Sequence, residues 1–415
     1  MTATLLQGDA RAVLATLPAG SVHMCVTSPP YWAQRAYQGV DAALGIGNEA
    51  TPELWVAALV EVFHEVRRVL RDDGTLWLNV GDKMAGSGGA GGDYNEGGLK
   101  ASANGTGPTA SRIKDLNSKQ ATNVANECVP RPLAPGYKPK DMIGLPWMLA
   151  FALRADGWYL RSEIIWHKLS PFPQSVTDRP TTAHEQLFLL AKRPNYFYDA
   201  EAVRERAQYG YSHSTGDDWT QGAGDSARNP QGSRRTVTPG SSGRSARSVQ
   251  TFAPSPFSVK RLGKYGPLPD VDHHALMPVS MATWCIRAGT SERGCCPECG
   301  VPQVRRVQKS GGSTGRGWHD HEAEEIRGER ITDPRAKGGH GYEVNTIGWA
   351  ASCTHVDLTL VPATVLDPFA GAGTTMLAAE RLGRNSIGIE LSPDYLALAA
   401  ARMHEAAPML AQEAQ

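Results

Sequence analysis

The sequence lacks the long hydrophobic runs of a membrane protein and carries no net charge. Of its 415 residues, 41% are hydrophobic, and no apolar run reaches the roughly 18 residues typical of a membrane-spanning helix. The first residues also lack the basic start and apolar core of a secretory signal. Lysine and arginine (42) balance aspartate and glutamate (42), so the overall charge says nothing about a polyanionic partner. We therefore expect a cytoplasmic protein with no membrane partner.

Cysteine is scarce, and the residues present do not suggest a disulfide framework. The seven cysteines of a chain expected in the cytoplasm are kept reduced. Cys296-Pro-Glu-Cys299, followed by a glycine, has the spacing with which two thiolates reach one metal ion. Together with a later Cys-Thr-His segment it predicts a structural zinc site with four ligands: Cys296, Cys299, Cys353 and His355. Unligated cysteines are the alternative, and rival ligands are available at Cys295, His319, His321 and His340.

Charge and composition vary strongly along the chain. Residues 226–264 contain eight basic side chains and no acidic one, which is an electrostatic footprint for phosphates. A solvated basic loop would have the same composition. Residues 84–125 are dominated by Gly, Ser, Ala, Asn and Thr, and they cannot bury enough apolar surface to order themselves. We expect this second segment to be a flexible insert.

The regular part of the sequence alternates strand and helix patterns. Apolar runs at 22–26 and 75–80, the second after a break at 72–74, are typical of buried strands, and Thr51-Pro52 predicts a helix start between them. That helix has apolar residues at helical spacing: Leu54, Ala58, Val62, Val66 and Leu70. Further elements are expected at 5–9, 11–17, 141–153, 159–166, 185–191, 364–367, 374–382, 386–391 and 393–404. The alternation predicts an α/β fold with a parallel sheet covered by helices.

A glycine-rich turn late in the sequence has the pattern of a site for a nucleotide-like ligand. Asp367 ends a predicted strand, and Gly371 and Gly373 let the backbone turn tightly and approach a ligand closely. Glu390 ends the next strand, where a carboxylate can accept hydrogen bonds from both ribose hydroxyls. A glycine turn alone is often only structural, but the added acid favours ligand binding.

A second motif, Ser28-Pro29-Pro30-Tyr31, follows the predicted strand at 22–26. In open α/β sheets, ligands bind where strands end. The exocyclic amine of a nucleobase is a poor nucleophile because its lone pair is delocalised into the ring. Ser28 Oγ and the Pro29 carbonyl are suitable acceptors for the amine hydrogens, the two prolines stiffen the turn, and Tyr31 offers a face for stacking. The segment therefore predicts a site for a flat, amine-bearing ring.

In this order along the chain, the two motifs resemble those of the beta-class, circularly permuted amino methyltransferases of DNA. The resemblance implies a Rossmann-like methyltransferase fold, circularly permuted, that transfers a methyl group from S-adenosylmethionine to a base flipped out of duplex DNA. It implies that segment 28–31 is catalytic. It also implies cofactor-binding residues from both ends of the chain: Asp9, Asp367, Phe369, Ala370, Gly371, Gly373, Thr374 and Glu390.

Three further segments resemble the family. Residues 274–290 are similar to the segment that packs on the methionine moiety, although about seventy residues separate it from the glycine turn, which indicates an inserted module. Trp166-His167-Lys168 is similar to a segment near the flipped base. Arg179, His184 and Glu185 lie in a similar Arg-Pro-Thr-x-x-His-Glu stretch, where they either support the active site or make structural hydrogen bonds.

The sequence leaves two exocyclic amines as possible targets, cytosine N4 and adenine N6. In the family a leading serine is commoner among cytosine-N4 enzymes, which favours cytosine N4, with adenine N6 as the alternative. Methylation of cytosine carbon-5 is disfavoured because neither motif has a cysteine nucleophile with a base partner, and Cys25 lies inside an apolar strand. More distant alternatives are methylation of a protein glutamine or an RNA base, and a catalytically inactive zinc-bearing DNA-binding protein.

The motifs suggest a methyltransferase domain interrupted by inserts. We expect a catalytic half, a flexible insert, the continued domain, a target-recognition region, a cofactor-side segment, a zinc-binding insert and a cofactor-binding half, at 1–83, 84–125, 126–191, 192–270, 271–292, 293–360 and 361–407. DNA is the expected partner. The sequence leaves open the recognition site, a homodimer, and a cognate restriction enzyme.

Overall fold

The computed structural model describes residues 2–33, 45–85, 136–171, 174, 176–205, 244–253, 277–310, 343–355 and 358–406. The chain forms two compact units. The first comprises 1–197, 248–290 and 362–415, and the second comprises 198–247 and 291–361. Most of the predicted glycine-rich insert and of the basic run lies outside the described residues, as do His274, His319, His321 and His340.

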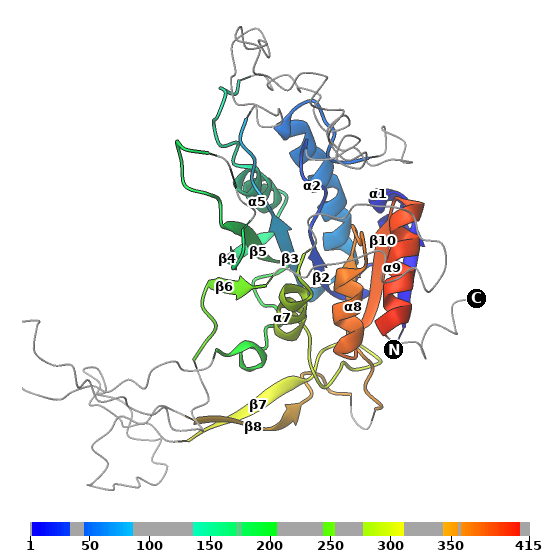
Figure 1. Cartoon of the computed structure of the whole chain (residues 1–415). Coiled ribbons are helices and arrows are strands. Elements are labelled where there is room, and N and C mark those ends of the chain that lie inside the picture. Colours follow the sequence, from blue (N-terminus) through cyan, green and yellow to red (C-terminus); the bar gives the residue numbers. More distant parts are fainter. Residues whose placement is uncertain are drawn as a thin grey trace, which may run out of the picture. The chain divides into compact units, whose positions relative to one another are not determined.

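An eight-stranded mixed sheet, in the order β1-β10-β9-β2-β3-β5-β4-β6, organises the first unit (Figure 1). Five strands, from β1 to β3 in that order, are parallel, whereas β5 runs antiparallel to both β3 and β4. The strands are β1 (Ala3–Gln7), β2 (Val22–Thr27), β3 (Leu70–Val80), β4 (Tyr159–Lys168), β5 (His184–Ala191), β6 (Val249–Phe252), β9 (Thr364–Asp367) and β10 (Asn385–Glu390). The expectation of a parallel sheet is therefore wrong for β5.

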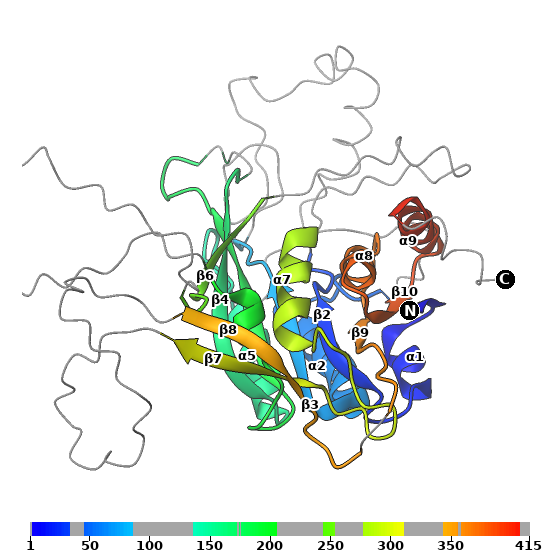
Figure 2. The same ribbon diagram turned by 90° about the horizontal axis from the view of Figure 1, so that it is seen from below.

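Helices cover both faces of this sheet, as the view in Figure 2 shows. The first layer contains α1 (Ala10–Thr16), α2 (Pro52–Val69) and α5 (Leu145–Ala155). The opposite layer contains α7 (Val279–Gly289), α8 (Thr374–Arg381) and α9 (Pro393–Ala406). Among the described residues, no helix combines the length and hydropathy needed to span a membrane.

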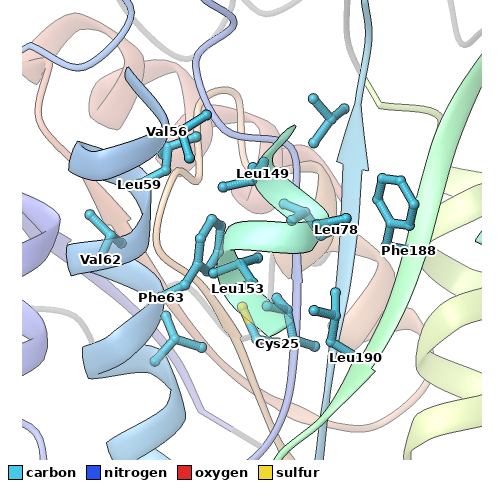
Figure 3. Close-up of a cluster of buried hydrophobic side chains, with 14 of the residues drawn as sticks. Cys25, Val56, Leu59, Val62, Phe63, Leu78, Leu149, Leu153, Phe188 and Leu190 are labelled. Carbon is cyan, nitrogen blue, oxygen red and sulfur yellow. The ribbon is translucent and has the colours of Figure 1, made fainter. Parts of the chain in front are cut away.

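The main core lies between the sheet and the first helix layer (Figure 3). Helix α2 begins as predicted: Thr51 Oγ1 accepts a hydrogen bond from Leu54 N, and Pro52 occupies the first turn. Its buried face matches the predicted one only in part: Val62, Val66 and Leu70 are buried, whereas Leu54 is 54% exposed. The buried residues of the helix are Pro52, Trp55, Val56, Leu59, Val62, Phe63, Val66 and Val69. The buried face is therefore wider than the predicted stripe and includes Trp55 instead of Leu54.

Two boundaries predicted from the sequence also differ from those in the structure. The expected break at 72–74 is a register irregularity within β3, between pairings Val22↔Leu70 and Met24↔Thr75, rather than an end of the strand. Strand β6 lies inside the range 192–270 proposed for target recognition, yet it pairs with β4 in the main sheet. That range is thus divided between the two units.

The second unit is built around a two-stranded antiparallel ribbon of β7 (Val304–Ser310) and β8 (Glu343–Ala350). Arg305 on β7 pairs with Asp199, at 2.9 Å, and with Glu292, at 2.7 Å. Its guanidinium also lies 4.4 Å from the centre of the Trp349 ring on β8. These contacts join the segment before the short 3-10 helix Glu201–Val203 to the ribbon.

Candidate active site

The two motifs meet where adjacent strands β2 and β9 end. Residues Met24 and Cys25 pair with Val365 and Leu366, which places the strand ends side by side. Beyond them, Thr27 Oγ1 donates a buried hydrogen bond of 2.7 Å to Asp367 Oδ1. Ser28 follows Thr27 directly, so the segment 28–31 and the glycine-rich turn share one edge of the sheet.

The glycine-rich turn leads from β9 into α8. Gly371 and Gly373 have φ values of 51° and 73°, in the left-handed region that glycine tolerates best. Gly373 is the N-cap of α8, and a Cβ there would lie 3.1 Å from the Ala399 Cβ. Position 373 therefore requires glycine for both its conformation and its close packing.

Two carboxylates lie beside this turn. Asp367 Oδ1 also accepts a 3.1 Å bond from Phe369 N. Glu390, at the end of β10, accepts from Gly371 N at 2.8 Å and from Ser392 N at 2.9 Å. Burial raises the pKa of both carboxyl groups above their ordinary values, because the charged forms lose hydration. The turn thus combines buried acceptors with backbone N–H groups.

A buried arginine that carries no sequence signal ties the turn to α9. Arg402 Nη1 donates to Ala372 O at 3.0 Å and to Thr374 Oγ1 at 2.9 Å. Burial lowers the pKa of Arg402 to about 10. The predicted cofactor residue Thr374 therefore uses its hydroxyl within the protein, as does Thr375, which donates to Val26 O at 3.2 Å.

Asp9 lies at the same sheet edge, because Gln7 in β1 is paired with Glu390 in β10. Its carboxylate caps α1 by accepting from Arg11 N at 2.8 Å, and it forms a 2.7 Å ion pair with the Arg11 guanidinium. The hydrogen bond from Arg11 lowers the pKa of Asp9. Asp9 is thus near the predicted cofactor residues but is held by its own arginine.

The segment 28–31 is anchored by side chains from α2 and from the core. Trp55 Nε1 donates to Pro30 O at 2.8 Å, so the carbonyl of the second proline is occupied. Ser28 Oγ lies 3.2 Å from Tyr31 Oη.

Tyr31 connects this segment to β3, β4 and β5. Its hydroxyl lies 2.9 Å from Glu185 Oε2 on β5 and 3.3 Å from Asn79 Oδ1 on β3. Lys168, the last residue of β4, places its Nζ 2.5 Å from Glu185 Oε1. Burial, and then the charge of Glu185, raise the pKa of Tyr31 well above its ordinary value. The phenol is therefore neutral at physiological pH.

Of the secondary candidates Lys168, Arg179, His184 and Glu185, only some lie near Tyr31. Glu185 contacts Tyr31 and is itself paired with Lys168. In contrast, His184 is exposed, and Arg179 bonds to its own loop, at 2.9 Å from Gln174 Oε1. Trp166 is buried and donates to Phe252 O at 3.1 Å. Its ring also lies 4.8 Å from Lys168 Nζ.

Three residues near the site were missed by sequence reasoning. Asn79 is buried inside β3. Asp82 accepts hydrogen bonds of 3.0 Å from both Gly144 N and Leu145 N, which caps the start of α5. Lys83 Nζ donates to the Ala33 carbonyl at 2.6 Å. The sequence signal was available: Asn79, Asp82 and Lys83 are three polar residues at the end of an otherwise apolar strand.

The described part of the methionine-side segment forms α7, which packs against β2, β3 and α8. A Cβ on Gly289 would lie 2.7 Å from Met24 Sδ, so the helix approaches the sheet closely. After it, Arg384 Nε donates to Thr290 Oγ1 at 3.1 Å. These contacts fix α7 beside the cofactor half of the sheet.

In the second unit, the four predicted metal ligands come together. The ligand atoms of Cys296, Cys299, Cys353 and His355 all lie within 4.8 Å of one another. The knuckle turn is closed by Gly300 N, which donates to Cys296 O at 2.8 Å. Hydrogen bonding from the Cys299 backbone lowers the pKa of the Cys296 thiol to about 7. Cys295 is buried but outside this cluster.

Comparison with protein families matches residues 22–296 and 358–401 to the DNA methylase family of N6 and N4 methyltransferases. The match covers both motifs and every strand of the main sheet except β1. The stretch that it leaves unmatched, 297–357, contains three of the four clustered metal-ligand candidates.

Individual proteins are also similar to the chain. The chain is 46% identical over 209 residues to the Type II methyltransferase M.Cfr9I of Citrobacter freundii, which covers 50% of this chain and 60% of that relative. It is 30% identical over 400 residues to the Type II methyltransferase M.SmaI of Serratia marcescens, covering 96% of this chain and 90% of the relative. Among solved structures, the cytosine-N4-specific PvuII DNA methyltransferase is 14% identical, with a TM-score of 0.49 and coverage of 97% and 86%.

Proposed function

The chain belongs to the DNA methylase family of N6 and N4 amino methyltransferases, and on that premise we propose that it methylates the N4 amine of cytosine in DNA. The observation that carries the proposal is the 2.7 Å hydrogen bond from Thr27 to Asp367. It ties the residue before Ser28 to the residue that opens the glycine-rich turn. The segment proposed to bind the base and the turn proposed to bind the cofactor therefore lie next to each other, which is the arrangement that methyl transfer would require.

The residues beside the turn suit S-adenosylmethionine, which supplies a methyl group already activated on a sulfonium. The positive φ values of Gly371 and Gly373 expose backbone to a ligand. Glu390 and Asp367 bring buried carboxylates to the same edge, where they can accept hydrogen bonds from ribose and amine groups. The residues that would hold the cofactor are Asp9, Asp367, Phe369, Ala370, Gly371, Gly373, Thr374 and Glu390. Of these, the side chains of Asp9 and Thr374 are already engaged by Arg11 and Arg402.

On the base side, Ser28 and the Pro29 carbonyl would accept the amine hydrogens, and Tyr31 would pack against the ring. Such a site works on a base that has left the helical stack, which costs about a few kcal/mol. The leading side chain selects the target: a serine hydroxyl is small and both donates and accepts, which suits a pyrimidine amine. Cytosine N4 is therefore favoured over adenine N6.

The test is methylation of plasmid DNA isolated from a methylation-deficient host, followed by digestion to nucleosides and mass spectrometry. We expect N4-methylcytosine. Detection of N6-methyladenine alone would overturn the choice of base but leave amine methylation in place. Absence of any methylated nucleoside, with S-adenosylmethionine bound, would identify a catalytically inactive DNA-binding protein.

We also propose that the second unit holds a structural zinc ion. Three thiolates and one imidazole form a common tetrahedral ligand set, and the four ligand atoms already lie within 4.8 Å of one another. A metal here would fasten the knuckle turn of Cys296–Cys299 to the segment after β8. Methyl transfer from a sulfonium needs no metal-activated water, so the ion would have no catalytic task.

Metal analysis of the purified full chain tests this proposal. We expect about one zinc per chain, which is the stoichiometry of a four-ligand site. Cys299→Ser should lose the metal, whereas the control Cys295→Ser should retain it. Equal zinc content in both variants, or none in the wild type, would contradict the assignment.

A further inference from the structure

Glu185 occupies a junction between three strands and the base-binding segment. It is the second residue of β5, and its neighbours come from β3, β4 and the turn after β2. Its two oxygens have different partners: Oε1 contacts Lys168 Nζ at 2.5 Å, and Oε2 contacts Tyr31 Oη at 2.9 Å and Asn79 Nδ2 at 3.2 Å. The side chain is only 16% exposed. Both oxygens of the Glu185 carboxylate are thus engaged, one by Lys168 and the other by Tyr31 and Asn79.

The number of protons available fixes the direction of the hydrogen bonds. A tyrosine hydroxyl has one proton, and in Tyr31 it is donated to the carboxylate of Glu185, the nearest acceptor. Tyr31 Oη must then accept from Ser28 Oγ, which lies 3.2 Å away. Ser28 has thereby used its only proton, so its lone pairs are left to accept a hydrogen from a bound amine. Through Tyr31, Glu185 thus determines that the Ser28 hydroxyl donates to Tyr31 and is left to accept a hydrogen bond from the bound amine.

We propose that Glu185 is the terminal acceptor for the proton that the methylated amine must lose, reached through Ser28 and Tyr31. The inference rests on the amine methylation proposed above and adds a proton route to it. Glu185 acts through other side chains, so it is a positioning and proton-accepting residue that does not itself touch the base.

The chemistry balances along this route. The amine nitrogen forms a bond to the methyl carbon as the carbon–sulfur bond breaks, and the bonding pair leaves with sulfur. The nitrogen then carries a positive charge and one hydrogen too many. Ser28 Oγ takes that proton as its own passes to Tyr31, and the phenolic proton passes to Glu185 Oε2. Serine and tyrosine end neutral, the carboxylate ends as a neutral acid, and no external base is needed.

Neighbouring groups support this role. The raised pKa of Tyr31 means that the phenol passes a proton on rather than remaining an anion. Asn79 Nδ2 also donates to Gln186 O at 3.1 Å, which fixes its amide orientation and presents a donor to Glu185. Lys168 holds the other carboxylate oxygen, so Oε2 stays aimed at the phenol. The arrangement is a fixed hydrogen-bond chain that ends at the Glu185 carboxyl group.

The decisive variant is Glu185→Gln, which keeps the shape and an acceptor for Tyr31 but cannot take up a proton at neutral pH. We expect the single-turnover rate of DNA methylation to fall by about 10²–10⁴-fold, while the affinities for S-adenosylmethionine and plasmid DNA stay within about threefold of wild type. The matched control is Asp72→Asn, which removes another lysine-paired carboxylate, 3.2 Å from Lys192 at the far end of β5. The control should retain full activity.

A double variant separates a proton route from a structural role. Tyr31→Phe interrupts the same chain, so Glu185→Gln combined with Tyr31→Phe should be no slower than the slower single variant, because residues acting as one unit are not additive. Additive losses would overturn the proposal. So would a Glu185→Gln rate within about fivefold of wild type, or a rate loss accompanied by equal losses in binding.

A spectroscopic measurement checks the contact without any methylation. Glu185→Gln removes a negative charge beside the phenol, so the tyrosinate absorbance of Tyr31, obtained by difference from Tyr31→Phe, should develop at lower pH than in the wild-type protein. An unchanged titration would overturn the proposal. If the wild-type product is N6-methyladenine, the chosen base is wrong but the proton route stands, since either amine must shed a proton.

Discussion

Replacing Thr27 by valine tests the link between the two halves of the site. Valine keeps the shape of threonine but removes the hydroxyl that donates 2.7 Å to Asp367 Oδ1. Thr27 is fully buried and Asp367 is 3% exposed, so water cannot replace the lost donor. A hydrogen bond to a charged group contributes about 1.5–3 kcal/mol. We expect the free energy of unfolding to fall by this amount at neutral pH.

The loss should depend on pH in a defined direction. Burial raises the pKa of Asp367, and the hydrogen bond from Thr27 opposes that rise. Because the folded-state pKa lies above the unfolded one, this group favours the folded state below the unfolded pKa, and that contribution is lost as pH rises through the folded pKa. Thr27→Val raises the folded pKa further. The difference between variant and wild type should therefore be small in acid and grow as the carboxyl group ionises.

Urea denaturation of both proteins at about pH 8 and about pH 5 measures this difference. Thr16→Val is the control, because its exposed hydroxyl donates to Val13 O at 2.7 Å, and surface changes of this kind stay within about 0.5 kcal/mol. A Thr27→Val loss no larger than that of the control would refute the reasoning. A loss that shrinks towards higher pH would do the same, because it would mean that Asp367 does not need the donor when charged.

Three further outcomes follow from close contacts. Gly81→Ala would place a Cβ 2.8 Å from Tyr31 Cε2, and we expect the displaced ring to lower the single-turnover rate by about 10²-fold with cofactor affinity unchanged; a normal rate would contradict the site. Gly388→Ala would drive a Cβ into Met376 Sδ, so unfolding by urea should become easier by about 1–3 kcal/mol, and unchanged stability would show that α8 has room to move. Arg402→Met removes both hydrogen bonds to the glycine-rich turn and should weaken S-adenosylmethionine binding, measured by calorimetry, by about tenfold. Unaltered affinity would show that Arg402 does not hold the turn in its binding conformation.

The sequence predicted best those elements whose signals are local. The run at 22–26 and the capped start at Thr51 are local signals, and both are present in the structure. The face of α2 was predicted only in part: Val62 and Val66 are buried, but Leu54 is exposed, because a stripe of every fourth residue drifts around a helix and only packing decides which end of it is covered. The antiparallel direction of β5 was missed because an apolar run has no direction until its neighbours are known.

The site was predicted only in part for a related reason. The rule that ligands bind where parallel strands end predicts that Ser28 and Asp367 lie close together. In the structure, Thr27, the residue before Ser28, is hydrogen-bonded to Asp367. Glu185 and Lys168 were secondary candidates because their meeting depends on the antiparallel pairing of β4 with β5. Arg402 gave no signal at all, since a single basic residue in an amphipathic helix looks like surface until the helix is packed.

The strand order has a consequence for how the protein is made. Strands β10 and β9, from the last sixth of the chain, lie between β1 and β2, which are synthesised much earlier. The sheet therefore cannot close until residue 390 has emerged, and its central pairings join residues more than 330 positions apart. Contacts of such long range form slowly. Until then the edges of β1 and β2 that face β10 and β9 have no partner strand, so we expect the growing chain to need protection from aggregation.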